Sequence, residues 1–452
     1  MNNRLIIIDQ LAKFPFRFGN FHLWPLLLLT FPKFNLLDTA YGKKLQYLCE
    51  KFPENQTASS KERQMDQKPM ANIRIIIACD SFKDGASSLE VCTAIASGVS
   101  HVSPNIITKI FPMADGGEGT ASVLTYYTSG TMVAVETVDP LERHIWAEYG
   151  LSADGQTAFI DMASASGIQL LDPEERNPLN TSTYGTGLMI RDAIKRNVKK
   201  IILGIGGSAT NDAGVGMAMA LGYRFYDESG NSVKGTGSEL SKITSYDWDQ
   251  KLLDKIPEVE VLADVNNPLY GHYGAAFVYG KQKGATGRSI KLLNEGLQSI
   301  AGVVSRQTDQ AFDQIPGAGA AGGMGFGAKA FLQATLVPGT ATVIQASGLE
   351  KALHEADYVF TGEGSIDEQT KNGKLVSGIC QLATRYNVPV IGLCGSLRAS
   401  SEDLRQIGLQ AAFSIVNEPL DLPTALLKTE FLLKKMSENV TRLIYSAHKR
   451  HS

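Results

Sequence analysis

The sequence predicts an α/β protein in which a mostly parallel sheet domain is split by an inserted second α/β domain that contains some antiparallel strands. Short apolar runs alternate with helical stretches from Ile73 onward, which is the pattern of successive βα units. Residues 131–161 break this pattern with short alternating stretches around turn signals. Apolar runs then continue toward the carboxyl end, so we expect the late strands to return to the first domain.

The first strand is expected at Ile73–Ala78, a run that is apolar except for Arg74 and suits a strand buried on both faces. A helix should follow, because Ser87 and Glu90 have the spacing of a capping box. Its apolar positions share one stripe: Leu89, Cys92, Ile95 and Val99. Later apolar runs predict strands at Lys200–Gly204, Val259–Ala263, Ala356–Thr361, Val388–Leu393 and Ala411–Ile415.

The interrupting stretch predicts antiparallel hairpins, with turns at Asp139–Pro140 and Asp154–Gly155. We place the inserted domain at 131–329, up to the end of a glycine-rich block. The first domain then comprises residues 71–130 and 330–452.

Residues 1–70 differ in character from the rest of the chain. The apolar segment 21–37 is interrupted by Pro25 and Pro32, so it is shorter than the ~20 unbroken residues of a spanning helix. Residues 51–69 are polar and resemble a disordered linker. We interpret 1–70 as an upstream extension, disordered or outside the native start; a targeting segment and a folded element are the alternatives.

Composition excludes several classes of protein. The formal net charge of −3 gives the whole chain no attraction to nucleic acid or to an anionic membrane. The five cysteines are scattered without a CxxC pair, which argues against zinc and a disulfide framework and favours the cytoplasm. None of the seven histidines lies in a glycine–acid cluster, so a Ser–His–Asp triad is disfavoured.

Two glycine–acid clusters lie early in the chain. Asp80 and Lys83 directly follow the first predicted strand, where open α/β sheets bind ligands. The alternative is a turn aspartate beside a solvated lysine. In the second cluster Asp115 and Glu118 flank Gly116 and Gly117; carboxylates suit magnesium, and glycines allow close backbone approach. Its alternative is a turn with acids at a helix start.

Two more clusters follow later strands. The segment 204–212 contains Gly206, Gly207, Ser208, Asn211 and Asp212 between a strand and a helix, an arrangement that aims N–H groups at an anion, although it lacks the Walker A spelling. A packing turn is the alternative.

The fourth cluster contains Glu363 and Asp367, again after an apolar run. The block 316–323 is either a phosphate loop or tight packing. Many carboxylates, anion-binding loops and few histidines favour phosphoryl transfer, which depends mainly on positioning and charge neutralisation.

Taken together, the blocks ACDSFK, ADGGEGT, ERNPLNTSTYGTG, GIGGSATND, ADVNNPLYG, QKGA, PGAGAAGGMG and TGEGSIDEQT resemble, in this order, the type I glycerate kinase family over about residues 71–445. The resemblance implies two α/β domains, the first flavodoxin-like and split by the second. It also implies transfer of the ATP γ-phosphoryl group to a hydroxyl of D-glycerate with Mg2+, giving 2-phosphoglycerate in organic acid catabolism.

This chain departs from the family pattern at Cys79, Ala213, Lys281 and Ser365. The last departure matters most, since arginine is common there. If that arginine neutralises phosphate charge, Lys83 or Lys374 must do so here.

The resemblance and the residues together give an expected site in a cleft between the two domains. We expect metal ligands at Asp115, Glu118, Glu363 and Asp367. Phosphates would meet Gly116, Gly117, Gly206 and Gly207, with Lys83 offsetting their charge. The glycerate carboxylate would bind Ser208, Asn211 or Arg176. Asp80 or Asp212 would be the general base.

The expected partners are ATP and D-glycerate, without nucleic acid or membrane, and a homo-oligomer is left open. Two other functions remain as alternatives: a kinase for another small hydroxy acid, and a non-catalytic nucleotide or metabolite sensor.

Overall fold

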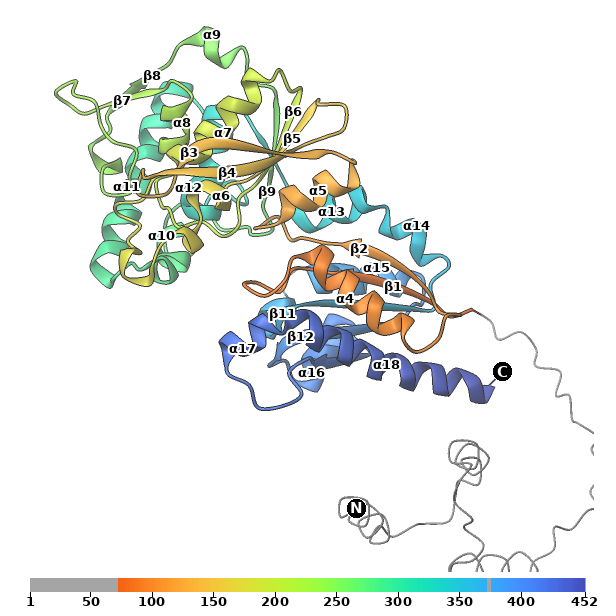
Figure 1. The fold of residues 1–452 in the computed structure, drawn as a ribbon. Coiled ribbons are helices and arrows are strands. Elements are labelled where there is room, and N and C mark those ends of the chain that lie inside the picture. Colours follow the sequence, from red (N-terminus) through yellow and green to blue (C-terminus); the bar gives the residue numbers. More distant parts are fainter. Residues whose placement is uncertain (1–71, 372–374, 452) are drawn as a thin grey trace, which may run out of the picture. The chain divides into compact units, whose positions relative to one another are not determined.

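The computed structural model describes residues 72–371 and 375–451, which contain two main sheets and a two-stranded one (Figure 1). The predicted extension at 1–70 lies outside the described residues, and so do Ala71 and Lys374. Within the described ranges, no helix is long and apolar enough to cross a membrane.

The first sheet has five parallel strands in the order β13-β12-β11-β1-β2. Their bounds are β1 Arg74–Cys79, β2 Ile107–Pro112, β11 Tyr358–Ile366, β12 Val390–Leu397 and β13 Ala411–Ser414. Read from β2, this is the flavodoxin-like order, with the chain reversing direction across the sheet between β1 and β11. In Figure 1 its strands are orange and blue, because they come from opposite ends of the described chain. The prediction of a split parallel sheet is confirmed.

Strand β1 is buried on both faces, as its apolar run predicted. Ile75 and Ile77 pack in one apolar cluster with α4 (Ser88–Ser100) and α18 (Thr429–His451). Ile76 and Ala78 face the opposite cluster. The helices contributing to this second cluster or adjoining it are α5 Thr120–Tyr127, α13 Gly339–Ser347, α14 Leu349–Leu353, α15 Leu375–Arg385 and α16 Ser401–Ile407; α17 spans Leu422–Leu427.

Helix α4 begins at the predicted capping box. The Ser87 hydroxyl accepts from the Glu90 N–H, and the Glu90 carboxylate accepts from the Ser87 N–H at 2.8 Å. Three of the four predicted stripe positions are buried, but Leu89 is exposed, so the stripe prediction was wrong there. Val91 takes part in the core instead.

The second sheet lies in sequence between the two halves of the first and has the order β10-β9-β6-β5-β4-β3. Its strands are β3 Thr131–Val138, β4 His144–Leu151, β5 Thr157–Asp161, β6 Lys200–Gly204, β9 Glu258–Leu262 and β10 Thr335–Val337. Strands β3, β4 and β5 pair antiparallel, which confirms the predicted hairpins, and the remaining pairs are parallel.

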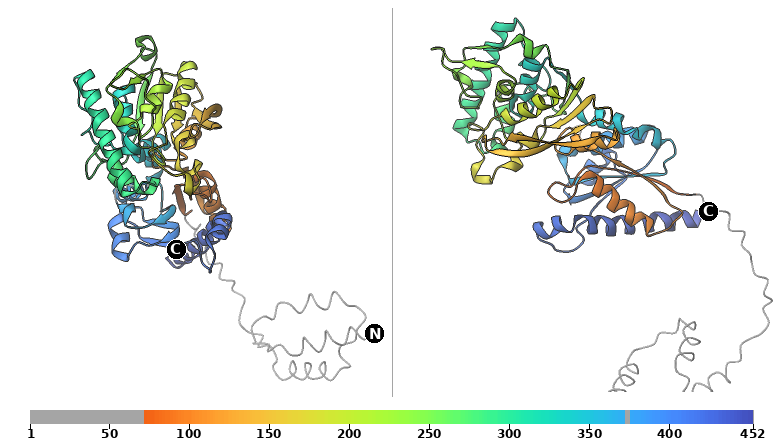
Figure 2. Two further views of the ribbon diagram at one scale, coloured as in Figure 1. Left: turned by 90° about the vertical axis from the view of Figure 1, so that its left-hand side faces the viewer. Right: turned by 45° about the horizontal axis from the view of Figure 1, so that its top comes forward.

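Helices surround this sheet and share one apolar core with it (Figure 2). They are α6 Ala163–Ser166, α7 Tyr184–Lys195, α8 Val215–Ala220, α10 Ala275–Tyr279, α11 Gly287–Thr308 and α12 Ala320–Leu332; α9 spans Gln250–Leu253. The small sheet pairs β7 Arg224–Tyr226 with β8 Ser245–Asp247. The glycine-rich block at 316–323 packs tightly, since a Cβ at Gly323 would meet the Cα of Ala213 at 2.8 Å.

The contact between α4 and α18 depends on Gly98. A Cβ there would overlap the Lys434 carbonyl oxygen and the Ser437 hydroxyl. We expect Gly98→Ala to lower the free energy of unfolding by about 1–3 kcal/mol, as overpacking does, in urea titrations. Gly302→Ala is the matched control, because a Cβ at this position in α11 meets only the Arg306 Nη1 at 3.5 Å. It should raise stability by about 0.5–1 kcal/mol. Equal effects of the two substitutions would contradict the packing argument.

Candidate active site

A cleft of about 660 Å³ opens where loops from the two main sheets meet. It is lined by residues that follow the carboxyl ends of β1, β2, β6 and β9. In the first sheet, the cleft lies at the carboxyl ends of the strands, near the point where the chain reverses direction between β1 and β11. Open α/β sheets bind ligands at this position. The predicted site residues that line it are Lys83, Asp115, Gly116, Gly117, Arg176, Gly206, Gly207 and Ser208.

Two glycine loops touch at the floor of the cleft. The Gly206 N–H donates to the Gly116 carbonyl at 3.3 Å. A Cβ at Gly206 would lie 2.6 Å from the Cα of Gly117, so only glycine fits there. This contact joins the loop after β2 to the loop after β6, and thereby brings the second and third predicted clusters into one site.

Carboxylates gather beside these loops. Asp115 lines the cleft and accepts from the Gly117 N–H at 3.0 Å. Asp80 is half-buried directly after β1 and does not itself line the cleft. Burial and the negative charges of Asp115 and Glu363 raise the pKa of Asp80 well above its usual range, against the opposing effect of the Ser81 hydrogen bonds. Asp115 and Glu363 are therefore both close enough to repel the Asp80 carboxylate.

The other three predicted metal ligands, Glu118, Glu363 and Asp367, do not line the cleft. Glu363, on β11, accepts from the Thr370 hydroxyl at 2.7 Å, and the Asp367 N–H donates to the same hydroxyl at 3.2 Å. Glu118 is exposed. Among residues 72–371 and 375–451, no three acidic, histidine or cysteine side chains are arranged to hold a metal ion by themselves.

Asp161, at the end of β5, fixes the loop that carries Asp115. Its carboxylate accepts from the Gly119 N–H at 2.8 Å and from the Ala121 N–H at 3.0 Å. Only 5% of the residue is exposed, and burial raises its pKa to about 7. A residue of the second sheet thus holds the start of α5.

Asp212, the other predicted base, is enclosed. Its carboxylate accepts from the N–H and hydroxyl of Thr183, both at 2.8 Å, and from the N–H groups of Gly214 and Gly216 at 3.2 Å. It is fully buried and does not line the cleft, and burial raises its pKa. Asn211 beside it is also buried, and its amide has no hydrogen-bond partner among the described residues.

Three cationic side chains line the cleft: Lys83, Arg176 and Lys283. Lys283 belongs to the 3₁₀ turn Lys281–Lys283 and is only 3% exposed. Its Nζ donates to the Ser208 hydroxyl and to the Thr210 carbonyl, each at 2.7 Å. Burial lowers the pKa of Lys283 to about 7, although Asp212 acts in the opposite direction.

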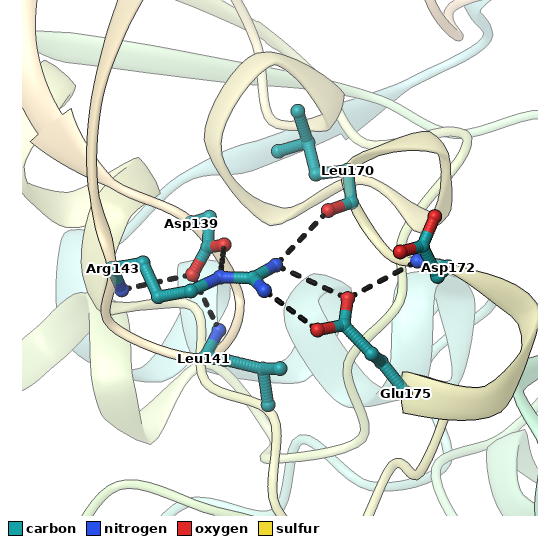
Figure 3. Close-up of polar contacts among 6 residues, drawn as sticks. All are labelled: Asp139, Leu141, Arg143, Leu170, Asp172 and Glu175. Atoms are coloured by element: carbon teal, nitrogen blue, oxygen red, sulfur yellow. Dashed lines mark hydrogen bonds and ion pairs between the residues drawn. The ribbon is translucent and has the colours of Figure 1, made fainter.

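The segment carrying Arg176 is held by Arg143 (Figure 3). The Arg143 guanidinium pairs with Asp139 and donates to both Glu175 oxygens, at 2.6 and 3.3 Å, and to the Leu170 carbonyl at 3.3 Å. These hydrogen bonds, together with the N–H of Asp172, lower the pKa of Glu175. The hairpin between β3 and β4 is thereby tied to the residues just before Arg176.

The same segment also pairs with the glycine loop. The Ile168 N–H donates to the Gly207 carbonyl and the Ala209 N–H to the Ser166 carbonyl, both at 2.9 Å. The Arg143 contacts therefore fix a wall of the cleft, because Ile168 and Arg176 line it.

Sequence reasoning left out Lys283, Asp264 and Asp161. Asp264 lines the cleft and accepts from the Gly339 N–H at 2.7 Å and the Thr340 hydroxyl at 2.7 Å. The sequence did contain signals for these residues. Lys283 lies in the QKGA block and Asp264 in the ADVNNPLYG block, both of which belong to the family pattern. Asp161 ends an apolar run, the same signal that drew attention to Asp80.

The sequence model of the glycerate kinase family, described as "Glycerate kinase family", matches residues 75–445. A protein of Halalkalibacterium halodurans named glycerate kinase is 44% identical over 81% of this chain and 97% of its own length. The glycerate 2-kinase of Escherichia coli is 41% identical over 76% of this chain and 91% of its own. A crystal structure from Salmonella typhimurium LT2, provisionally named glycerate kinase 2, has 42% identity and a TM-score of 0.72, covering 83% and 99% of the two chains.

We expect Arg143→Met to free the residues before Arg176. Amide hydrogen exchange at 171–176 should become faster, because the guanidinium contacts to Glu175 and Leu170 are lost. Arg224→Met is the matched control, since Arg224 pairs with Asp247 in the small sheet and does not line the cleft. Unchanged exchange at 171–176 in Arg143→Met would contradict the assigned role.

Asp161 should make stability fall as pH rises. Its folded pKa of about 7 lies above the unfolded value near 3.9, so the folded state keeps a proton that the unfolded state releases. Its contribution is fully present below about pH 4 and lost as pH rises through about 7, by at most roughly 1.4 kcal/mol per pH unit.

The measurement is urea unfolding of wild type and Asp161→Asn between pH 4 and 8 in metal-free buffer. The stability of wild type relative to Asp161→Asn should decline over this range. Asp154→Asn serves as the control, because hydrogen bonds from Ser152 and Gln156 lower the pKa of this exposed aspartate and give it the opposite sign. A difference that does not vary with pH would refute the assignment for Asp161.

Proposed function

This chain belongs to the glycerate kinase family, and on that premise we propose that it transfers the γ-phosphoryl group of ATP to the 2-hydroxyl of D-glycerate with Mg2+. The family membership makes it a phosphotransferase that acts on glycerate. The supporting observation is the cleft in which Asp115, Lys83 and the glycines of two loops come together. Phosphoryl transfer asks for positioning and charge neutralisation, and these groups supply both.

The nucleotide phosphates are assigned to the side of the cleft near Asp115, Gly116 and Gly117. Magnesium is commonly held by one or two protein carboxylates together with substrate phosphates, so a complete protein cage is not required. The repulsion of Asp80 by Asp115 and Glu363 fits a divalent cation, whose charge would neutralise the phosphates when bound. Ser365 stands where arginine is common in the family. Lys83, which lines the cleft, is available in its place to offset the negative charge of the transferred phosphoryl group.

Asp80 is the better candidate for the general base. Its pKa is raised, which makes its carboxylate a stronger base than an ordinary aspartate, and it lies close to Asp115, which lines the cleft. Asp212 is less suited, because four donors from Thr183, Gly214 and Gly216 already occupy its oxygens. We assign Asp212 to holding the glycine loop. The glycerate carboxylate is assigned to Ser208 and Arg176.

The choice of the 2-hydroxyl follows the name of the Escherichia coli relative. Four described cysteines are free and buried, which is consistent with the reducing cytoplasm that we propose as the location. The alternative of a non-catalytic sensor is less favoured, since the acidic and glycine clusters of the cleft are retained.

The decisive experiment is phosphorus NMR of the product formed from D-glycerate, ATP and magnesium. We expect the resonance of 2-phosphoglycerate and none without magnesium. Tartronate and lactate, tested in the same assay, provide the comparison. A clear preference for one of them would favour a kinase for another hydroxy acid. ATP hydrolysis without any phosphorylated acceptor would contradict the proposal.

Asp80→Asn should reduce kcat by roughly 10²–10⁴-fold, the usual contribution of a general base, while the Kd for ATP changes little. Asp212→Asn should chiefly lower the melting temperature, because it disturbs hydrogen bonds within the protein. Steady-state kinetics and thermal unfolding of both variants test this. Full turnover in Asp80→Asn would remove it as the base.

A further inference from the structure

Lys283 and Arg176 lie on one wall of the cleft, and neither has an acidic partner among the described residues. The Lys283 ammonium is almost completely buried, yet both of its acceptors, the Ser208 hydroxyl and the Thr210 carbonyl, are uncharged. No ion pair joins Lys283 or Arg176 to another described residue, and the buried Nε of Arg176 lacks a hydrogen-bond partner there. Buried charges are costly when unpaired, so this wall is built for an anion.

The backbone segments that carry Lys283 and Arg176 lie against each other. Gly284, directly after Lys283, has a φ of +93°, and a Cβ there would overlap the Arg176 carbonyl oxygen. The turn carrying Lys283 therefore lies against the segment carrying Arg176. Both side chains line the cleft beside Ser208.

The nearest acid does not neutralise this wall. Asp212 is close enough to oppose the burial effect on Lys283, but its oxygens accept hydrogen bonds from Thr183, Gly214 and Gly216. An ammonium has three N–H donors, and the described contacts of Lys283 use two of them. One donor of Lys283 and the guanidinium of Arg176 are thus available to a ligand.

The acceptor carboxylate fits this wall better than a phosphate of the nucleotide. The acids that line the cleft, Asp84, Asp115 and Asp264, lie on the loops after β1, β2 and β9 and would repel a carboxylate that carries no metal. They suit a nucleotide that arrives with magnesium. We infer that Lys283 is a specificity-determining residue that, with Arg176 and Ser208, binds the carboxylate of the hydroxy acid. This inference rests on the proposed glycerate kinase activity.

The test compares Lys283→Met, which keeps the length of the side chain without its charge, with wild type. The KM for D-glycerate should rise ~10–100-fold, the loss expected for a charge-assisted hydrogen bond. The KM for ATP should stay within about twofold. Preference for D-glycerate over glycerol, which has no carboxylate, should fall by the same factor as the glycerate affinity.

Lys281→Met is the matched control, since Lys281 is an exposed residue of the same turn and does not line the cleft; it should behave as wild type. Arg176→Gln gives a second, independent variant if Lys283→Met does not fold. It should show the same selective loss, since the Arg176 Nε has no partner to lose.

A rise in the KM for ATP without one for glycerate would overturn the inference and assign this wall to a nucleotide phosphate. A lower melting temperature with unchanged KM values in both variants would overturn it too, and leave Lys283 a structural role. The proposed function is judged separately, because its failure would appear in the wild-type protein, as absence of any phosphorylated glycerate.

Discussion

The site depends on the close approach of two glycine loops, one from each main sheet. Gly116 and Gly117 follow a strand of the first sheet, and Gly206 follows a strand of the second. Their backbones meet through a hydrogen bond and leave no room for a side chain at Gly206. Because backbone amides need such access to contact phosphate groups, this approach both joins the sheets and forms the floor of the cleft.

Acidic and basic side chains lie mainly on different segments around this floor. Carboxylates lie on the loops after β1, β2 and β9, and burial together with the charges of Asp115 and Glu363 raises the pKa of Asp80. The buried Lys283 and the half-buried Arg176 lie on segments of the inserted part, whereas Lys83 follows β1. This arrangement supports our proposal that a nucleotide with its metal and a small acid anion bind side by side, because each anion would meet the charge that suits it.

Asp115 and Arg176 line the cleft, and the segments that carry them are held in place by residues that do not line it. Asp161 holds the loop of Asp115 through two backbone amides, and Arg143 holds the segment of Arg176 through Glu175. Both belong to the second sheet or its hairpin. Their contacts tie the second sheet and its hairpin to residues that line the cleft.

Local pattern was sufficient for much of the architecture. The apolar run of β1, the capping box of α4 and the hairpins after residue 131 could be predicted because each depends on neighbours in sequence. Leu89 was misassigned, since helical spacing alone does not say where the neighbouring helix begins to cover it.

The sequence by itself determined the family and the set of glycine and acid clusters, because ordered motifs and strand patterns are written along the chain. The tertiary structure decided which of those residues share one cleft. It enclosed Asp212 behind four donors, exposed Glu118, and buried Lys283 beside Ser208, 75 residues away in sequence. Burial and distance follow from how the sheets and loops pack, and neither is encoded in the spacing of residues along the chain.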